Sequence, residues 1–390
     1  MVAGRAGALL RFPRDVDSAP VGGAAGEEGS DPPVRTVVIH QQEFPVRHRL
    51  SQYAIDRPLE RCRTVVHRND DGNLHRPNIA PYLRTVELTV AICTYRRENR
   101  LVLALDSLAR QTDTRFRTVI VDNAGTATCR KQAERYEVAY TVATPVGLSH
   151  ARNHALRTAT TPWVLFFDDD AIADPTIIAT LRDSPLHDRY PKLAAVGGYY
   201  EHYFDLPPPR WLSYYYREPV RPSPSPVDCL LPPGRYLVGG MLAVDRRVAL
   251  GVGGFDPELG MRGTAFGYAE ENRLQDAMRA AGYAVGYVPR AGMRHLVAAR
   301  KYSVGARYEM ALAQGRSRPR ENYGYGRAAY DLGKAIIHAL TIDTARAARS
   351  YLGASRNTDS GPTVRFLPQN VWVNLVQKVG FIRGRLTSRP

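Results

Sequence analysis

Three apolar segments of strand length constrain the fold of this chain more than any other feature. They are residues 88–93, 118–121 and 163–167, and segments with helical periodicity follow the first and precede the third. Strands that alternate with helices form parallel sheets with right-handed crossovers, and fully apolar strands are covered on both faces. We therefore expect an α/β fold with a central, mostly parallel sheet flanked by helices.

Polar residues follow each of these segments, namely Thr94, Asp122 and the aspartates at 168–170. The carboxyl ends of the strands in an open α/β sheet border the crevice in which ligands bind. The sequence therefore predicts a functional site at this edge of the sheet.

Three adjacent aspartates, Asp168, Asp169 and Asp170, follow the third segment. Like charges repel one another and lose hydration when buried, and a divalent cation offsets both costs. Alternate residues of an extended segment point to the same side, so Asp168 and Asp170 can face one ion. Carboxylates with open positions for water and diphosphate oxygens suit Mg²⁺ or Mn²⁺. We predict a metal site, with a solvated acidic turn as the alternative.

Asp122 ends the second segment and precedes Asn123. A carboxylate here could accept the imide N–H of uracil or thymine. The alternative is a turn-forming residue, a role that Asp-Asn sequences often have. The sequence leaves both interpretations open.

Five further positions are candidates. Glu270 and Glu271 begin a predicted helix, where they could supply a general base or merely stabilise the helix dipole. A lone histidine such as His295 is more often a structural or surface residue than a ligand. Gly239 and Gly240 indicate a turn or a close approach of the backbone.

The formal net charge of +15 favours anionic partners such as nucleotides or phospholipid headgroups. The four cysteines lack the spacing of a disulfide framework or a zinc site, which favours a reduced, cytoplasmic chain. No segment reaches the roughly 18 consecutive apolar residues of a membrane-spanning helix. We therefore predict neither export nor a membrane span, and we expect no nucleic-acid partner.

Taken in order, these residues resemble the family 2 glycosyltransferases, which have the GT-A fold. The resemblance runs from about Val90 to His295. Residues 90–97 resemble the first strand and nucleotide-binding loop of the family. The other matching positions are Asp122, Gly147, Ala151, Arg152, Asn153, the DxD motif at 168–170, the acidic pair Glu270 and Glu271, and His295.

The resemblance implies a single displacement with inversion at the anomeric carbon, in which a metal ion stabilises the leaving diphosphate. Glu271 would be the general base; because the family usually has aspartate there, Glu270 is the alternative base. The metal would be held by Asp168, Asp170 and His295. The residues assigned to a UDP- or dTDP-sugar are Thr94, Tyr95, Arg97, Asp122, Arg152, Asn153, Asp168 and Asp169.

We divide the chain into four parts. Residues 1–34 are predicted to be a disordered arm and residues 35–86 a small β-rich extension. Residues 87–297 form the predicted catalytic domain, and residues 298–390 a basic helical region. Within the catalytic domain, Gly239, Gly240 and Trp211 are expected to contact the acceptor, and the Pro- and Tyr-rich segment 206–234 would shape its pocket.

Residues 371–386 predict a helix with an apolar face and basic flanks. Such a helix either lies on an anionic membrane surface or packs on the catalytic domain. The first possibility implies a lipid-linked saccharide as acceptor and a peripheral location at the inner face of the cell membrane. The second favours a soluble secondary metabolite or peptide.

Two other classes of protein deserve comparison. A sugar nucleotidyltransferase would normally carry a glycine-rich phosphate loop after its first strand, and residues 94–97 do not form one. An inactive nucleotide-sugar-binding module would not need intact aspartates and an acidic pair. A glycosyltransferase is therefore the favoured interpretation.

Overall fold

The computed structural model describes residues 11–12, 35–36, 83, 87–216, 218–318, 323–339, 341, 345 and 367–388. The chain divides into two units, Met1–Glu60 and Arg61–Pro390. In the first unit, β1 (Arg11–Phe12) pairs antiparallel with β2 (Arg35–Thr36). The predicted arm 1–34 and extension 35–86 therefore lie almost wholly outside the described residues.

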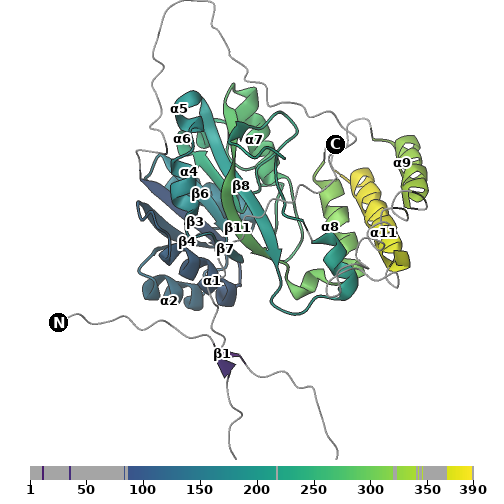
Figure 1. The fold of residues 1–390 in the computed structure, drawn as a ribbon, viewed down its shortest axis with the longest axis horizontal. Coiled ribbons are helices and arrows are strands. Elements are labelled where there is room, and N and C mark those ends of the chain that lie inside the picture. Colours follow the sequence, from purple (N-terminus) through teal and green to yellow (C-terminus); the bar gives the residue numbers. More distant parts are fainter. Residues whose placement is uncertain are drawn as a thin grey trace, which may run out of the picture. The chain divides into compact units, whose positions relative to one another are not determined.

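A mixed sheet forms the centre of the second unit (Figure 1). Its strand order, within the described residues, is β5-β4-β3-β6-β10-β8-β11-β7, and β9 also pairs with β11. The first four are β5 (Ala139–Val142), β4 (Phe116–Asp122), β3 (Leu88–Thr94) and β6 (Trp163–Asp168). The others are β10 (Met241–Asp245), β8 (Leu193–Tyr203), β11 (Ala284–Leu296), β7 (Ala171–Ala173) and β9 (Cys229–Leu230).

The direction of pairing changes halfway across this sheet. Strands β5, β4, β3 and β6 are parallel, as expected for the predicted α/β fold. Beyond β6, β10 is antiparallel to both of its neighbours, and only β8 and β11 are parallel to each other. The chain between β8 and β10 is a long proline-rich segment, and antiparallel neighbours need no helical crossover. The sheet is therefore less parallel than the sequence predicts.

Successive residues of the central strands point to opposite faces of the sheet. In β6, Leu165 and Phe167 belong to the core on one face, whereas Val164 and Phe166 belong to the core on the other. The first face is covered by α1 (Glu98–Ala109), α2 (Ala127–Arg135), α4 (Ile177–Arg182) and α5 (Leu186–Arg189). The second face is covered by α3 (Leu148–Thr158), α6 (Arg246–Gly251) and α7 (Glu270–Ala280).

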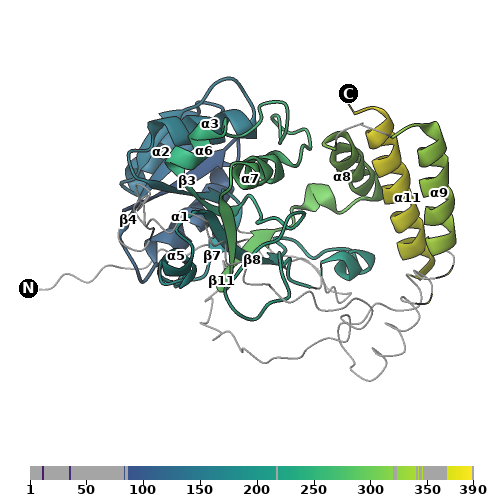
Figure 2. The ribbon, with the colours of Figure 1, turned by 90° about the horizontal axis from the view of Figure 1, so that it is seen from above.

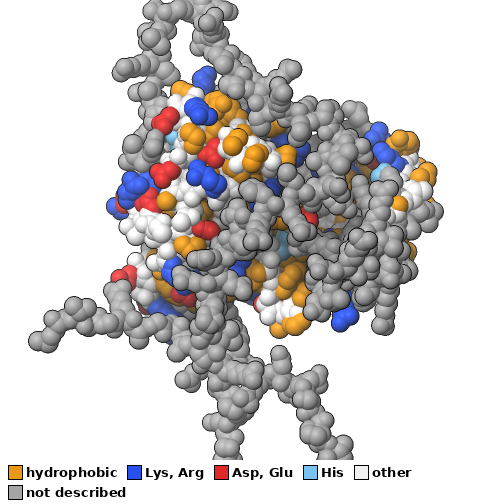
Figure 3. Space-filling model, viewed as in Figure 1, with side chains coloured by type: hydrophobic (Ala, Val, Ile, Leu, Met, Phe, Trp, Pro, Cys, Tyr) orange, Lys and Arg blue, Asp and Glu red, His pale blue; other side chains and the backbone are white. Residues whose placement is uncertain are grey.

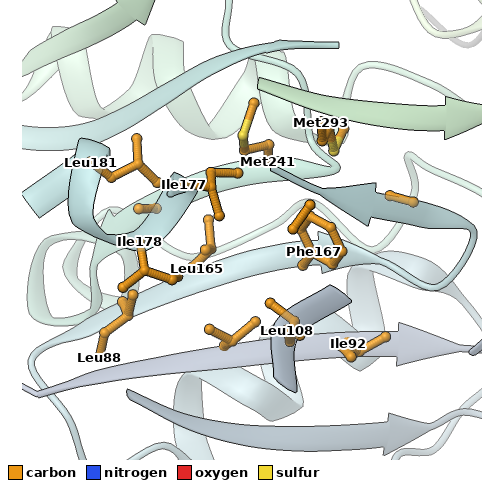
Figure 4. Packing of buried hydrophobic residues seen from close by; sticks show 14 of the residues in the cluster. Leu88, Ile92, Leu108, Leu165, Phe167, Ile177, Ile178, Leu181, Met241 and Met293 are labelled. Atoms are coloured by element: carbon orange, nitrogen blue, oxygen red, sulfur yellow. The ribbon is translucent and has the colours of Figure 1, made fainter. Parts of the chain in front are cut away.

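Figure 4 shows part of the first core, in which Leu88 and Ile92 of β3 lie near Leu165 and Phe167 of β6 and Leu108 of α1. Each of these side chains is at most 3% exposed. Burial of one such side chain stabilises the fold by about 1.5–3 kcal/mol. This packing on both faces holds the carboxyl ends of the strands in place.

The described part of residues 298–390 is helical. Its elements are η2 (Ala299–Lys301), α8 (Val304–Arg316), α9 (Tyr325–His338) and α11 (Leu367–Leu386). Helix α11 lies between α8 and α9 (Figure 2). Among the described helices, none is long and apolar enough to cross a bilayer.

One face of α11 packs closely on α8. A Cβ atom at Gly380 or Gly384 of α11, or at Gly315 of α8, would collide with backbone atoms of the facing helix. Val373 is wholly buried and packs near η1 (Arg210–Tyr215). One side of α11 is thus covered within the protein, whereas Trp372 and Val379 of the apolar face predicted at 371–386 are 59% and 40% exposed. Packing on the protein is therefore observed for part of this helix, and contact with a membrane stays a prediction.

Candidate functional site

The carboxyl ends of β3, β4 and β6 meet at one edge of the sheet. In the strand register Thr94 lies beside Asp122, and Cys93 lies beside Asp168. This arrangement follows from parallel pairing of the three apolar segments, and it places the three predicted strand ends at one location.

Asp168, Asp170 and His295 form a group with the composition of a metal site. The His295 Nε2 atom is 3.4 Å from Asp168 Oδ2 and 3.3 Å from Asp170 Oδ1. One ligand atom from each of the three residues can be chosen so that all lie within 4.8 Å of one another. Two carboxylates and one imidazole leave positions open for water or diphosphate oxygens, as Mn²⁺ and Mg²⁺ sites require. The residues therefore fit the predicted metal.

Strand β11 brings His295 to the aspartates. His295 pairs with Ala171 of β7, the residue after Asp170, and the Leu296 N–H donates to the Asp170 carbonyl at 3.0 Å. Burial acts to raise the pKa of Asp168, but the His295 hydrogen bond and the nearby Arg152 outweigh it, and the pKa is lowered. The tertiary pairing of two short strand segments thus completes the group.

The middle aspartate has different partners. Thr94 Oγ1 donates to Asp169 Oδ2 at 2.7 Å, and Arg97 Nη1 donates to Asp169 Oδ1 at 3.1 Å and to Asp170 Oδ2 at 3.2 Å. Burial raises the pKa of Asp169 to about 6, with Arg97 opposing and Asp170 adding to the shift. Asp169 therefore holds the loop after β3, and its predicted contact with the nucleotide sugar stays a prediction.

Arg152 joins the aspartates to the glutamate pair. Its Nη1 atom donates to Glu270 Oε1 at 2.8 Å, and its Nη2 atom is 3.8 Å from Asp168 Oδ1. The guanidinium carbon lies 5.8 Å and 5.2 Å from the ring centroids of Phe166 and Phe255. Because Arg152 is only 3% exposed, it acts here as the buried counter-ion of Glu270.

Glu271 differs from its neighbour in lacking this ion pair. Burial raises the pKa of Glu271 to about 8, the charge of Glu270 adds to the rise, and Arg152 opposes it. A carboxylate with a pKa near neutrality is well matched to accept a proton from a hydroxyl group. Ala269, which precedes Glu270, has a left-handed φ of 75°, a strained conformation that is concentrated at functional sites.

The backbone of Gly239 and Gly240 lies directly against two side chains of the site, those of Arg152 and Asp168. A Cβ atom on Gly239 would meet the Arg152 guanidinium, and one on Gly240 would meet the Asp168 carboxylate. The close backbone approach, one of the two meanings open to these glycines, is therefore the one observed. Their predicted contact with an acceptor gains no support, since the space beside them is filled by Arg152 and Asp168.

Asp122 organises the loop that follows β4. Asp122 is wholly buried, with Oδ1 accepting from the Ala124 N–H at 2.8 Å and Oδ2 from the Thr126 N–H at 2.6 Å. Tyr140 Oη also donates to Oδ2, at 3.0 Å. This is the turn-forming role, and recognition of a base by Asp122 stays a prediction.

Three other residues that were predicted to contact the donor or the acceptor lie in three different environments. Asn153 exchanges two hydrogen bonds with the backbone of Phe255, at 2.7 Å and 2.8 Å, and so fixes the loop before α7. Tyr95 is half-buried after β3, near Gly263. Trp211 is 7% exposed and packs in the apolar cluster that includes Val373 of α11. Trp211 therefore joins η1 to α11, and its predicted contact with an acceptor stays a prediction.

Several basic residues near the aspartates were missed in the sequence. Arg100 Nη1 is 3.9 Å from Asp170 Oδ2, and Lys301 follows β11 in η2. Burial lowers the pKa of Lys301, with the charge of Asp170 opposing and those of Arg300 and Arg97 adding. Only weak sequence patterns could have identified these two residues: Arg100 follows Arg97 by about one helical turn, and Lys301 follows His295 by six residues. Together these cations make the edge suitable for a diphosphate.

Comparisons with known proteins agree with the motif resemblance. Residues 89–250 match the family model described as glycosyl transferase family 2. An uncharacterized glycosyltransferase of Haemophilus influenzae is 31% identical over 90 residues, which cover 21% of this chain and 29% of that protein. The chain thus aligns with less than a third of this curated relative. The predicted resemblance to family 2 is confirmed over the matched residues.

Two solved structures resemble the chain at a TM-score of 0.43 each. The first is the mannosyltransferase PcManGT of Pyrobaculum calidifontis in complex with GDP-Man and Mn²⁺, at 19% identity over 80% of this chain and 77% of that chain. The second is GalNAc-T7 with UDP, GalNAc and Mn²⁺, at 12% identity over 74% of this chain and 57% of that chain.

Proposed function

We propose that this chain, whose residues 89–250 match glycosyl transferase family 2, is a metal-dependent glycosyltransferase. It moves a sugar from a UDP- or dTDP-sugar to an acceptor hydroxyl, with inversion at the anomeric carbon. The observation that carries the proposal is the grouping of Asp168, Asp170 and His295, with His295 Nε2 within 3.4 Å of both carboxylates. Arg152 links this group directly to Glu270 and therefore to the acidic pair.

We assign two roles to the residues of the site: one group binds the metal and the diphosphate, and the other accepts the proton of the acceptor hydroxyl. Asp168, Asp170 and His295 would hold Mn²⁺ or Mg²⁺, which when bound supplies positive charge for the leaving diphosphate. Arg97, Arg100 and Lys301 add positive charge around the same carboxylates and orient the donor.

Glu271 acts on the other side as the general base. A pKa of about 8 lets the carboxylate bind the acceptor proton while the new glycosidic bond forms. Glu270 cannot take this role as readily, because one of its oxygens is held by Arg152. This contact favours Glu271 over the alternative base that the family pattern left open.

The donor and acceptor are the finer parts of the proposal. A pyrimidine diphosphate sugar is supported by the position of Asp122 at the end of β4, next to Thr94. Base contact would use the remaining lone pair of Asp122 Oδ1 and would require the adjoining loop to move, because Asp122 is wholly buried. For the acceptor we favour a lipid-linked saccharide, and a soluble metabolite or peptide is the alternative.

Hydrolysis of the donor in the absence of acceptor tests the function directly. We expect release of nucleoside diphosphate that requires Mn²⁺ or Mg²⁺, stops with a chelator and is restored by added metal. Binding of UDP, dTDP and GDP, measured by calorimetry, tests the donor class. Preferential binding of GDP, or hydrolysis that a chelator does not affect, would contradict the respective part of the proposal.

A further inference from the structure

Helix α9 exposes an unusual number of large apolar side chains. The exposed fractions are 79% for Tyr325, 61% for Tyr330, 37% for Leu332, 42% for Ile336 and 63% for Ile337. Scattered exposed apolar residues are normal, but a group of them on one short helix marks an interaction surface.

The exposed residues occupy one side of α9. On a helix of about 3.6 residues per turn, Tyr325, Leu332 and Ile336 share one side, and Tyr330 and Ile337 lie roughly 130° further round, so the five side chains span an arc of roughly 160°. Ala328 and Ala335 lie outside this arc and are buried: Ala328 is 6% exposed and packs with Ile382 and Leu386 of α11, and Ala335 is 7% exposed. Helix α9 therefore packs through its small residues and turns its large apolar ones outward.

Positive charge borders this apolar surface. Arg327, Lys334 and His338 recur at helical spacing and form the stripe next to Tyr330 and Ile337. Figure 3 shows hydrophobic side chains beside basic and histidine side chains at the position that α9 has in Figure 1. The acidic residue of α9, Asp331, accepts from Tyr323 Oη at 2.9 Å and pairs with Arg327 at 3.3 Å.

The surrounding sequence has the same charge. Residues 317–390 contain twelve Lys and Arg but only four Asp and Glu. Helix α11 repeats the pattern, with Trp372 59% and Val379 40% exposed and with exposed Lys378 and Arg383. A second copy of this surface would bring like charges together, whereas an anionic surface would neutralise them.

We propose that α9 lies on an anionic membrane surface. Tyr330, Ile336 and Ile337 enter the boundary between headgroups and acyl chains, and Lys334 lies against the lipid phosphates. This surface lies on a different helix from the face predicted at 371–386, of which Trp372 and Val379 are exposed. Its consequence for the acceptor rests on the proposed function: docking would bring the site to a lipid-linked acceptor.

Co-sedimentation of the full chain with lipid vesicles tests the docking. The vesicles are phosphatidylcholine alone or phosphatidylcholine with phosphatidylglycerol, each at low and high salt. We expect binding only to the anionic vesicles, and weaker binding at high salt. Binding to neither vesicle type, or equal binding to both, would overturn the proposal.

Matched variants assign the binding to α9. Each of Ile336→Glu and Ile337→Glu is expected to weaken vesicle binding about tenfold or more, and Lys334→Glu about fivefold or more. The control is Val227→Glu, which changes a residue that is 66% exposed but lies outside the C-terminal helices. Equal loss of binding in Val227→Glu and Ile337→Glu would refute the assignment. So would a dimer that Ile337→Glu dissociates, because the surface would then bind a second copy.

Donor hydrolysis separates this proposal from the proposed function. The substituted α9 side chains are exposed, so the variants should fold and hydrolyse the donor at the wild-type rate in solution. Loss of vesicle binding with hydrolysis retained supports docking by α9. Hydrolysis that does not depend on Asp170 would instead refute the function and leave the docking result unchanged.

Discussion

The aspartate group and the glutamate pair are neighbours in one site but carry their negative charge in different ways. Asp168 and Asp170 have side chains that are 29% and 6% exposed, and they share His295 and several peripheral cations. Glu270 pairs at 2.8 Å with the buried Arg152, whereas burial and the charge of Glu270 raise the pKa of Glu271. The same functional group is thus suited to be a metal ligand, a structural ion-pair partner or a base according to its neighbours.

Removing a charge from the aspartate group should have the largest effect. We expect Asp170→Asn to lower the transfer rate about 10⁴-fold, because it removes a metal ligand and with it several kcal/mol of charge stabilisation. The rate is measured with saturating Mn²⁺ or Mg²⁺, and circular dichroism checks the fold. Normal turnover of Asp170→Asn in the presence of a chelator would remove the metal from the mechanism.

The corresponding change in the glutamate pair is Glu271→Gln. We expect a loss of about 10³-fold in rate, typical of a positioned base, with unchanged affinity for the donor in calorimetry. Glu270→Gln is the matched comparison. If Glu271→Gln were active and Glu270→Gln inactive, the two roles would be exchanged.

The ion pair between Arg152 and Glu270 should matter for stability. Arg152→Met leaves a buried carboxylate without its counter-ion, and we expect a loss of about 3–5 kcal/mol in the free energy of unfolding. Chemical denaturation measures this loss. The double variant Arg152→Met, Glu270→Gln should recover much of it, and no recovery would show that the pair is not coupled.

The pH dependence of transfer should report Glu271. The base works in its deprotonated form, so with a pKa of about 8 the rate should rise about tenfold per pH unit below that value and level off above it. The comparison is Glu271→Asp, whose profile should move with the pKa of the new carboxyl group. A flat profile between pH 6 and 8 (about two units below the expected plateau) would exclude Glu271 as the base.

The smallest expected effect concerns the close approach of the Gly240 backbone to the Asp168 side chain. Gly240→Ala places a Cβ atom against the Asp168 carboxylate, so Asp168 must shift. We expect about a tenfold higher metal concentration for half-maximal rate, typical of a change that disturbs a ligand without removing it. Gly251→Ala is the control, since a Cβ atom there meets nothing within 4 Å. Equal metal dependence of the two variants would contradict the role given to Gly240.

Local patterns in the sequence determined the strands and much of the site. The apolar runs ending at Thr94, Asp122 and Asp168 predict buried parallel strands, and strand ends necessarily meet at one edge. The DxD motif and the pairing of Glu270 with Glu271 are equally local. These features depend on residue type and spacing over a few positions, so the chain reveals them directly.

Only the tertiary structure decided which side chains become partners. Arg152 pairs with Glu270, 118 residues away, and neither motif indicates this partnership. Burial of Trp211 by α11 and the outward apolar side of α9 likewise depend on how distant helices pack. Spacing along the chain encodes the face of each element, but desolvation and pairing depend on what that face meets, and that is determined by long-range packing.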